Sequence, residues 1–138
     1  GTPANKEDKF SDEVETTWKT IEYSYMDFIE KSVRLFNKGN YKKALSRFET
    51  ILASYPDDVN ANFYAGLCLF NFGEYKLANE SFNKCLTGPF PNFDEEALWM
   101  MALCYEGLGK KAEAKRLFTE IEKMSGFYAT QAKSKLIK

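Results

Sequence analysis

The sequence predicts an all-α protein, an α-solenoid of three helix-turn-helix repeats. One spacing, Gly-(x4)-Ala-(x3)-Phe, occurs three times, beginning at Gly39, Gly73 and Gly109. These glycines are 34 and then 36 residues apart, and a fixed period in this range is typical of arrays in which each helical hairpin covers the next. Hydrophobic residues make up 44% of the 138-residue chain, enough for a packed core and too many for a disordered protein.

The first predicted helix runs from about residue 12 to residue 38. No glycine or proline interrupts this stretch, and its apolar positions recur every three or four residues, as on one face of a helix. That stripe comprises Val14, Trp18, Ile21, Tyr25, Phe28, Ser32 and Leu35. Asp12 followed by Glu15 is the predicted capping box at its start, and a break near residues 23–25 stays open.

Residues 1–10 are polar, and we expect them to be frayed, so residues 1–24 are predicted to be an N-terminal extension.

Glycine, proline and acidic residues divide the rest of the chain. The helices that they delimit are predicted at about 41–54, 58–72, 75–87, 94–108 and 111–124. The three repeated glycines each end a helix, because glycine adopts the left-handed conformation found at helix C-termini without strain. Pro56, Asp57 and Asp58 end one helix and cap the next. The proline-rich loop at 89–93 holds the two extra residues of the second interval.

The last predicted helix lies within residues 127–138 and combines an apolar stripe with a lysine-rich face, as expected of a helix that caps an array. Charge is uneven along the chain. Residues 1–24 hold three Lys and six Asp or Glu, about −3, whereas residues 110–138 hold eight Lys or Arg and three Glu, about +5. Solvated helix faces are the simplest interpretation. Head-to-tail contact between copies, or an anionic partner at the C-terminal end, is the alternative.

Composition excludes several classes of function. The net charge of −1 argues against nucleic-acid binding by bulk electrostatics. Because the chain has no histidine, Ser-His and Cys-His catalysis and histidine-ligated zinc are excluded. Cys68, Cys85 and Cys104 form no CxxC pair and fall inside helical patterns, so we expect core packing. We therefore predict no catalytic residue, cofactor or metal, and no run of apolar residues long enough to contact a membrane as a spanning helix.

The repeated stretches resemble the tetratricopeptide repeat (TPR), with repeats at 25–58, 59–92 and 95–128. The small residues that the family keeps where its two helices cross are matched by Ser32 with Ala44, Gly66 with Ala78, and Ala102 with Ala114. Its large aromatic residue is matched by Phe48, Phe82 and Phe118, and the Tyr after the turn by Tyr41 and Tyr75. The third repeat departs from this pattern with Lys111.

Residues 96–105 and 127–136 are similar to the end of many bacterial TPR proteins, in which a membrane-spanning helix often precedes the repeats. The chain opens with Gly1 and lacks an initiator Met, so we expect the natural protein to continue upstream. The resemblance implies a periplasmic or other extracytoplasmic part of a membrane-anchored protein, and leaves the compartment itself open.

The resemblance also implies that a protein segment binds in the concave groove, which is lined by the first helix of each repeat. By the repeat phase, the groove residues are Met26, Ile29, Val33, Phe36, Asn37, Asn60, Phe63, Leu67, Phe70, Asn71, Glu96, Trp99, Leu103 and Glu106. Val33, Leu67 and Leu103 stand where TPRs that clamp the carboxyl terminus of heat-shock chaperones carry polar or basic residues, so we expect no such clamp. Asn37 and Asn71 are placed to hydrogen-bond a ligand backbone.

We therefore predict a non-catalytic interaction module that binds an apolar or amphipathic protein segment. The alternative is a self-associating scaffold, with a homodimer as one form, in which the N-terminal helix fills its own or a neighbour's groove through Phe10, Val14, Trp18 and Ile21. In a third interpretation, the groove aromatics simply pack as core. Phe90 and Phe93 are predicted either to form a second contact point or to pack back onto the helix ends. The partner's identity stays open.

Overall fold

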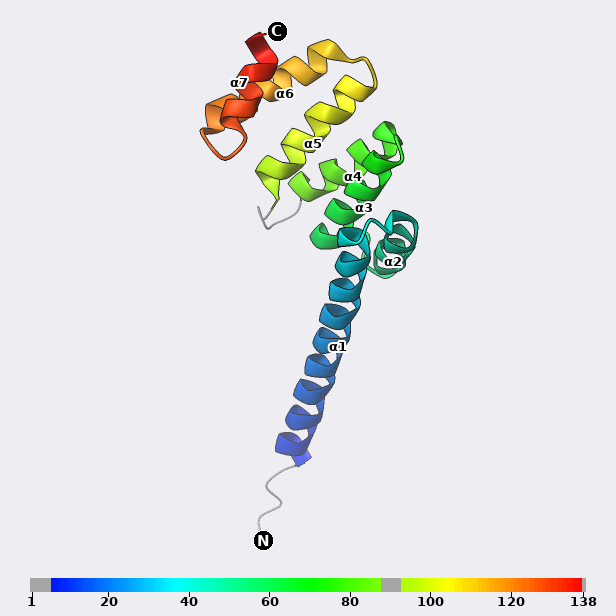
Figure 1. Ribbon diagram of the computed structural model, residues 1–138. Helices are drawn as coiled ribbons and strands as arrows, with labels where there is room; N and C mark the ends of the chain where they lie inside the picture. Colours follow the sequence, from blue (N-terminus) through cyan, green and yellow to red (C-terminus); the bar gives the residue numbers. More distant parts are fainter. Residues whose placement is uncertain (1–5, 88–92, 138) are drawn as a thin grey trace.

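The computed structural model describes residues 6–87 and 93–137, and all of its regular elements are α-helices (Figure 1). In chain order they are α1 (Lys6–Asn37), α2 (Tyr41–Ser54), α3 (Val59–Asn71), α4 (Tyr75–Thr87), α5 (Asp94–Gly107), α6 (Lys111–Met124) and α7 (Ala129–Ile137). The all-α prediction is confirmed, and from α2 to α6 the predicted bounds agree with these to within about one residue. Phe90 lies outside the described residues.

The structure of α1 corrects the predicted helix start and capping box and settles the question of a break. The helix begins at Lys6 rather than near residue 12 and runs unbroken through residues 23–25. Asp12 and Glu15 therefore lie inside the helix, and Glu15 forms an exposed ion pair with Lys19 one turn later. The physical reason is that no Gly or Pro stands between residues 6 and 38, so nothing in the local chemistry stops the helix at Asp12.

The same turn joins the two helices of every repeat. Gly39, Gly73 and Gly109 have φ values of 80°, 76° and 74°, in the left-handed region that favours glycine. In the first turn, the N–H of Asn40 donates to the carbonyl of Leu35 at 2.9 Å, and the other two turns repeat this bond. This six-to-one bond is a Schellman motif, which ends the first helix and sends the second back antiparallel.

The small residues that are predicted at the helix crossings are buried. Ala44, Ala78 and Ala102 are fully buried. A β-carbon added to Gly66 would lie 2.7 Å from the ring of Phe82, so only glycine allows this ring so close to α3. The first repeat uses Ser32, whose hydroxyl donates to the carbonyl of Phe28.

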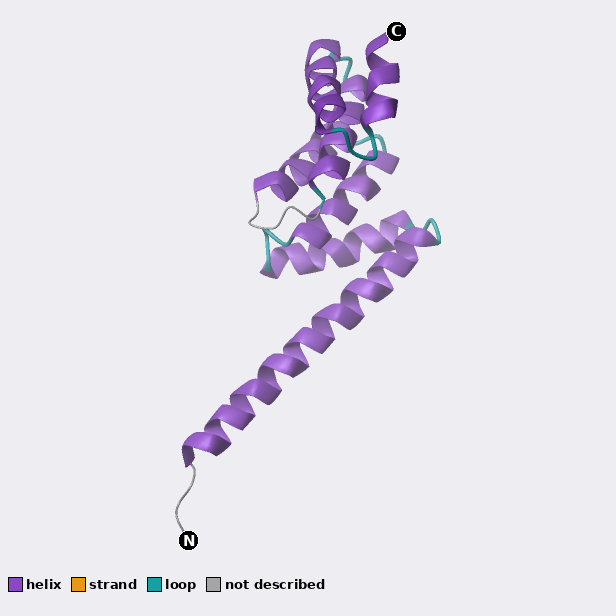
Figure 2. Ribbon diagram, turned by 90° about the vertical axis from the view of Figure 1, so that its left-hand side faces the viewer, coloured by secondary structure: helices purple, strands orange, loops and turns teal. Residues whose placement is uncertain are grey.

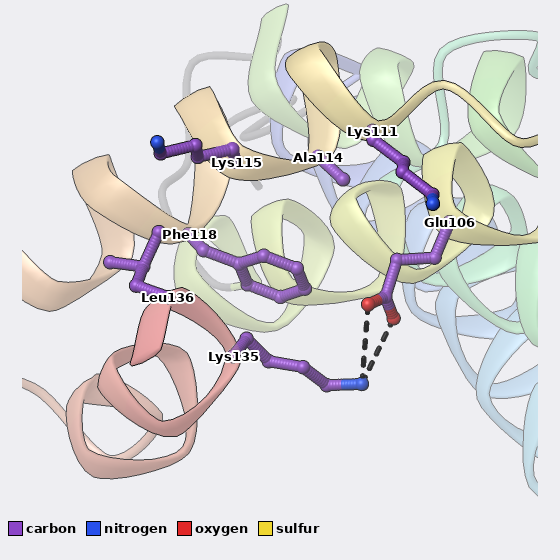
Figure 3. A pocket seen from close by; sticks show the side chains of 7 residues that line it. All are labelled: Glu106, Lys111, Ala114, Lys115, Phe118, Lys135 and Leu136. Atoms are coloured by element: carbon purple, nitrogen blue, oxygen red, sulfur yellow. Dashed lines mark hydrogen bonds and ion pairs between the residues drawn. The ribbon is translucent and has the colours of Figure 1, made fainter. Parts of the chain in front are cut away.

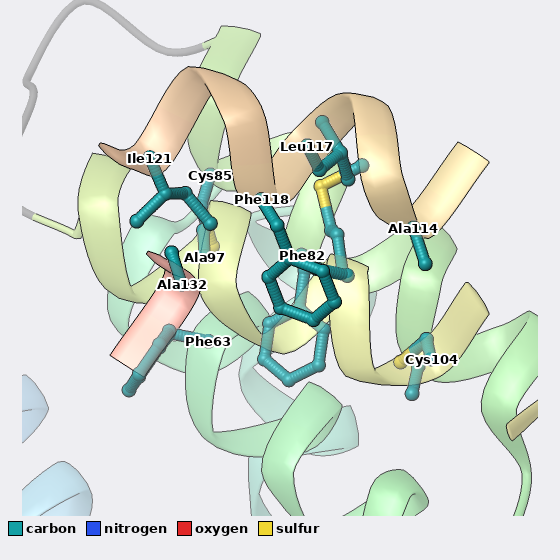
Figure 4. Close-up of a cluster of buried hydrophobic side chains, with 13 residues drawn as sticks. Phe63, Phe82, Cys85, Ala97, Cys104, Ala114, Leu117, Phe118, Ile121 and Ala132 are labelled. Atoms are coloured by element: carbon teal, nitrogen blue, oxygen red, sulfur yellow. The ribbon is translucent and has the colours of Figure 1, made fainter. Parts of the chain in front are cut away.

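Two buried clusters form the core. The first joins α1, α2 and the near side of α3, around Phe48 and Ile51. The second runs from α3 to α7, around Phe82, Phe118 and Ile121 (Figure 4). Tyr64 on α3 packs against both clusters and stacks on Phe48 with ring centroids 5.5 Å apart, so α3 is the element that the two clusters share.

The three cysteines are buried as free thiols, as predicted. Burial raises the pKa of Cys68 to about 11 and the pKa values of Cys85 and Cys104 to about 12. These thiols are therefore protonated at neutral pH and behave as small apolar side chains. Within residues 6–87 and 93–137, no helix is both long and apolar enough to cross a membrane, and no cluster of three potential metal ligands occurs.

The N-terminal half of α1 projects away from the stacked hairpins in both ribbon views (Figures 1 and 2). Residues 11–17 are exposed to solvent. The prediction that this segment folds into the groove of its own chain is therefore wrong, because a continuous helix carries it outward. The side chains of Phe10, Trp18 and Ile21, on which that prediction also depended, lie outside the described part.

Candidate functional site

A cavity of about 340 Å³ lies between the C-terminal half of α1 and α3, and Phe93 closes one side of it. Its lining comprises Met26, Ile29, Glu30, Val33, Arg34, Asn60, Tyr64 and Phe93. Four of these residues, Met26, Ile29, Val33 and Asn60, were predicted from the repeat phase. We call this space the groove cavity.

The groove cavity has an apolar floor and a polar rim. Ile29 is buried, Val33 is half-buried, and Met26 is 46% exposed at the edge. Glu30 and Arg34 are exposed, one turn of α1 apart, and bring one charge of each sign. A surface of this kind can bury an apolar side chain while polar groups at its edge hydrogen-bond the ligand backbone.

A hydrogen-bond network fixes α1 against the start of α3, and so fixes the two walls of the cavity. The hydroxyl of Tyr25 donates to the carboxylate of Asp58, with O···O distances of 2.8 and 2.9 Å. Asp58 also caps α3 by accepting from the N–H of Ala61 at 2.8 Å. Burial, with the Asp58 carboxylate adding to it, raises the pKa of Tyr25 to about 12. The phenol therefore stays a donor at neutral pH.

Phe93 reaches the cavity because its ring stacks on Phe63 of α3. The ring centroids are 4.4 Å apart and the planes differ by 4°. Phe63 is itself buried and meets Phe82 edge to face. The stack anchors the residue before α5 to the second core cluster. For Phe93, the prediction that a ring packs back onto the helix ends is confirmed.

Other predicted groove residues occupy different surroundings. Phe36 and Phe70 meet Tyr41 and Tyr75 edge to face, each with centroids 5.3 Å apart. Trp99 stacks on Tyr128, with centroids 5.1 Å apart. The aromatic residues among the predicted groove residues, Phe63 included, are therefore largely engaged in packing between helices.

The remaining predicted residues lie on α1, α3 and α5, and none of them lines the groove cavity. Leu67, Leu103 and Glu96 are half-buried. Asn37 and Asn71 are exposed, and the side-chain amide of Asn71 donates to the carbonyl of Leu67 in its own helix at 2.9 Å. Glu106 forms an ion pair with Lys135 at 3.0 Å, at the far end of the array. The structure thus brings four of the predicted residues into one cavity and distributes the rest.

Sequence reasoning missed four lining residues: Glu30, Arg34, Tyr64 and Phe93. A signal existed for the first two, since they follow Met26 at spacings of four and eight and so share its side of α1. Tyr64 belongs to the core pattern of α3, and the direction of Phe93 depends on a loop that sequence patterns do not define.

Comparison with protein families gives two matches, both described as tetratricopeptide repeat, over residues 30–91 and 96–123. Together they cover well over half of the chain. No curated protein matches the sequence significantly.

Several solved structures share the fold. The type III secretion chaperone SycD of Yersinia enterocolitica, in complex with a peptide of the translocator YopD, has a TM-score of 0.73 at 18% identity, covering 82% of this chain and 89% of SycD. The first TPR domain of RPAP3, bound to the HSP90 peptide SRMEEVD, has a TM-score of 0.68 at 18% identity, covering 80% of this chain and 88% of that domain. YrrB, described as a TPR protein with an unusual peptide-binding site, has a TM-score of 0.70 at 19% identity, covering 86% of this chain and 61% of YrrB.

Proposed function

We propose that this chain, which belongs to the tetratricopeptide repeat family, is a non-catalytic interaction module that binds an apolar or amphipathic protein segment in the groove cavity. The observation that carries the proposal is the convergence of Met26, Ile29, Val33 and Asn60 on one open cavity. These residues come from the first helices of two successive repeats, the elements that line the groove in this family. Peptides bound by SycD and by RPAP3 show that similar folds hold protein segments.

The shape and chemistry of the groove cavity favour one class of ligand. Its apolar floor between α1 and α3 suits one or two large apolar side chains, and its rim carries Glu30, Arg34 and Asn60. Because the rim charges are of opposite sign, it offers no cluster of cations for a terminal carboxylate. An amphipathic segment, with an apolar face on Ile29 and Val33 and its polar face to solvent, fits this arrangement.

The test starts from peptides selected on the wild-type protein from a random 12-residue display library, and measures their binding by fluorescence anisotropy. We expect dissociation constants of about 1 µM for a single short groove, corresponding to about −8 kcal/mol. Met26→Asp places a charge at the edge of the apolar floor and should weaken binding by about tenfold, the equivalent of about 1.4 kcal/mol.

Met124→Asp is the matched control. Met124 is 45% exposed, almost the same as Met26, but it lies at the end of α6 and does not line the groove cavity. Circular dichroism should show equal helical content in both variants. If Met26→Asp and Met124→Asp bind the selected peptides equally well, the groove cavity is not the binding site.

Self-association is the second candidate, and one observation favours it. The N-terminal half of α1 leaves the body of its own chain and keeps residues 11–17 exposed, so it is free to meet a second copy. In this candidate, the helix of one copy enters the groove cavity of a neighbouring copy. Met26→Asp, which alters that cavity alone, would then abolish the association.

A further inference from the structure

A second cavity, of about 490 Å³, lies at the C-terminal end of the array, between α5, α6 and α7 (Figure 3). We call it the C-terminal cavity. Its apolar part consists of Ala114, Phe118 and Leu136, and its polar part of Glu106, Lys111, Lys115 and Lys135. None of these four charged residues lines the groove cavity, so the two cavities are separate surfaces.

Comparison of the repeats shows how this cavity arises. Glu106 and Lys111 stand where the second repeat has Phe70 and Tyr75, 36 residues earlier in each case. In that repeat the two rings meet edge to face with centroids 5.3 Å apart. The third repeat thus replaces an aromatic pair by two charged residues. Lys115 likewise stands 36 residues after Asn79.

The cavity carries an excess of positive charge. Lys135 pairs with Glu106, with N···O distances of 3.0 and 3.4 Å. Among the described residues, Lys111 and Lys115 have no carboxylate within 4.0 Å. The outer face of a terminal repeat must be polar to keep a repeat array soluble, but this requirement is met by positive or by negative side chains. Solubility alone therefore does not explain the excess of lysines. Here lysines of two helices lie beside an apolar floor, an arrangement that suits an acidic segment.

The N-terminal half of α1 has the complementary composition. Residues 1–24 carry about −3, and Asp12, Glu13 and Glu15 are exposed. Asp12 and Glu15 are three residues apart and so share one side of the helix. The pair between Glu15 and Lys19 is exposed and competes only weakly with other contacts.

These two surfaces lie at opposite ends of the molecule in both ribbon views, so they cannot meet within one chain (Figures 1 and 2). We propose that the N-terminal half of α1 of one copy docks in the C-terminal cavity of a second copy, with Asp12 and Glu15 facing Lys111 and Lys115. Because each copy carries both surfaces, the contact is head-to-tail and extends beyond a dimer. It uses a different cavity from the proposed function and does not depend on it.

The test measures molar mass by light scattering and sedimentation over a range of protein concentrations. The wild-type mass should rise with concentration at about 50 mM salt and fall back towards the monomer at about 500 mM, where charges are screened within a few ångströms. Asp12→Lys with Glu15→Lys, and separately Lys111→Glu with Lys115→Glu, should each weaken association at least tenfold.

Mixing the two double variants is the decisive step. Each alone brings like charges together, whereas in the mixture every helix meets a cavity of opposite charge, so association should return. Lys42→Glu with Lys43→Glu is the matched control, since it makes the same charge change as the cavity variant on exposed residues of α2. This control should still associate.

Four results would overturn the proposal. A wild-type protein that stays monomeric at all concentrations and at low salt would remove it. So would association that survives both double variants, or a mixture that stays monomeric while circular dichroism shows both variants folded. Association abolished by Met26→Asp but not by Lys111→Glu with Lys115→Glu would assign the helix to the groove cavity instead.

Discussion

The second and third repeats share one backbone turn but differ in the side chains that surround it. In both turns the glycine has a left-handed φ, 76° at Gly73 and 74° at Gly109. In both, the residue after the glycine donates to the carbonyl five residues earlier, at 2.9 Å for Glu74 and 2.8 Å for Lys110. Beside this common turn, one repeat has a pair of aromatic rings and the other has Glu106 and Lys111.

The difference follows from what lies next along the array. A β-carbon added to Gly107 would lie 2.6 Å from the ring of Tyr75, so α5 of the third repeat covers this ring directly. In the part of the chain that the structure describes, α7 ends at Ile137 and nothing equivalent covers Lys111. The turn itself thus requires only its own glycine. The residue types beside the turn, Phe70 and Tyr75 in one repeat and Glu106 and Lys111 in the other, depend on whether a following repeat covers them.

The largest expected effect on the free energy of unfolding comes from placing a larger side chain between the two helices of a repeat, and it should differ between the second and third repeats. Ala78→Leu forces a larger side chain into a fully buried site between α3 and α4, and should destabilise the protein by about 1–3 kcal/mol. Ala114→Leu makes the same change at the equivalent position, but Ala114 borders the C-terminal cavity, which can accept the extra atoms, so its cost should stay below about 1 kcal/mol. Urea unfolding measures both. Equal costs would show that the end repeat is packed as tightly as the middle one.

A smaller difference is expected between the interaction energies of the two residue pairs beside the turns, Phe70 with Tyr75 and Glu106 with Lys111. A double-mutant cycle with Phe70→Leu and Tyr75→Leu should give a coupling energy of about 0.5–1.5 kcal/mol, as expected for an edge-to-face aromatic pair. The cycle with Glu106→Ala and Lys111→Ala should give less than about 0.5 kcal/mol, because exposed charges interact weakly. A coupling of similar size in both cycles would contradict the contrast between the repeats.

The smallest expected difference concerns the buried thiols. Burial raises the pKa of Cys85, in the second repeat, and of Cys104, in the third, from 9.0 to about 12. Both should therefore react slowly and at similar rates with Ellman's reagent at pH 8, and rapidly once the protein is unfolded. Mass spectrometry of the labelled peptides distinguishes them. Faster labelling of Cys104 would show that the third repeat is open in its core as well as at its turn.

The same thiols make stability depend on alkaline pH. Their folded pKa values exceed the ordinary value, so their contribution is complete below about pH 9 and is lost as the pH rises towards about 12. The unfolded chain ionises first and is favoured by the rise. Thermal unfolding recorded between pH 8 and pH 11 should show the melting temperature falling over this range.

The sequence predicts the repeat region well because the residues that end and cap its helices act through their own local conformation and hydrogen bonds. Gly39, Gly73 and Gly109 mark helix ends through their own conformational freedom, and Asp58 caps α3 as expected. The start of α1 was predicted too late because Asp12 and Glu15 also occur as ordinary neighbours on an exposed helix. A capping motif without a helix breaker before it is a weak signal.

The groove cavity was predicted only in part, for a tertiary reason. Helical phase places Met26, Ile29 and Val33 on one side of α1, and all three line the groove cavity. The position of Phe93 depends on its stack with Phe63, and the sequence does not define the loop that brings the two together. Similarly, repeat spacing aligns Lys111 with Tyr75, but only the placement of α7 turns the lysines into the wall of a cavity.

The continuity of α1 gives the molecule a mechanical property. The helix has 32 residues, a length of about 48 Å, and its last turns carry Met26, Ile29 and Val33. The projecting arm and one wall of the groove cavity therefore belong to a single rod, which the bond between Tyr25 and Asp58 holds against α3. A force on the projecting arm therefore acts on the same helix that carries one wall of the groove cavity, and the bond between Tyr25 and Asp58 resists it.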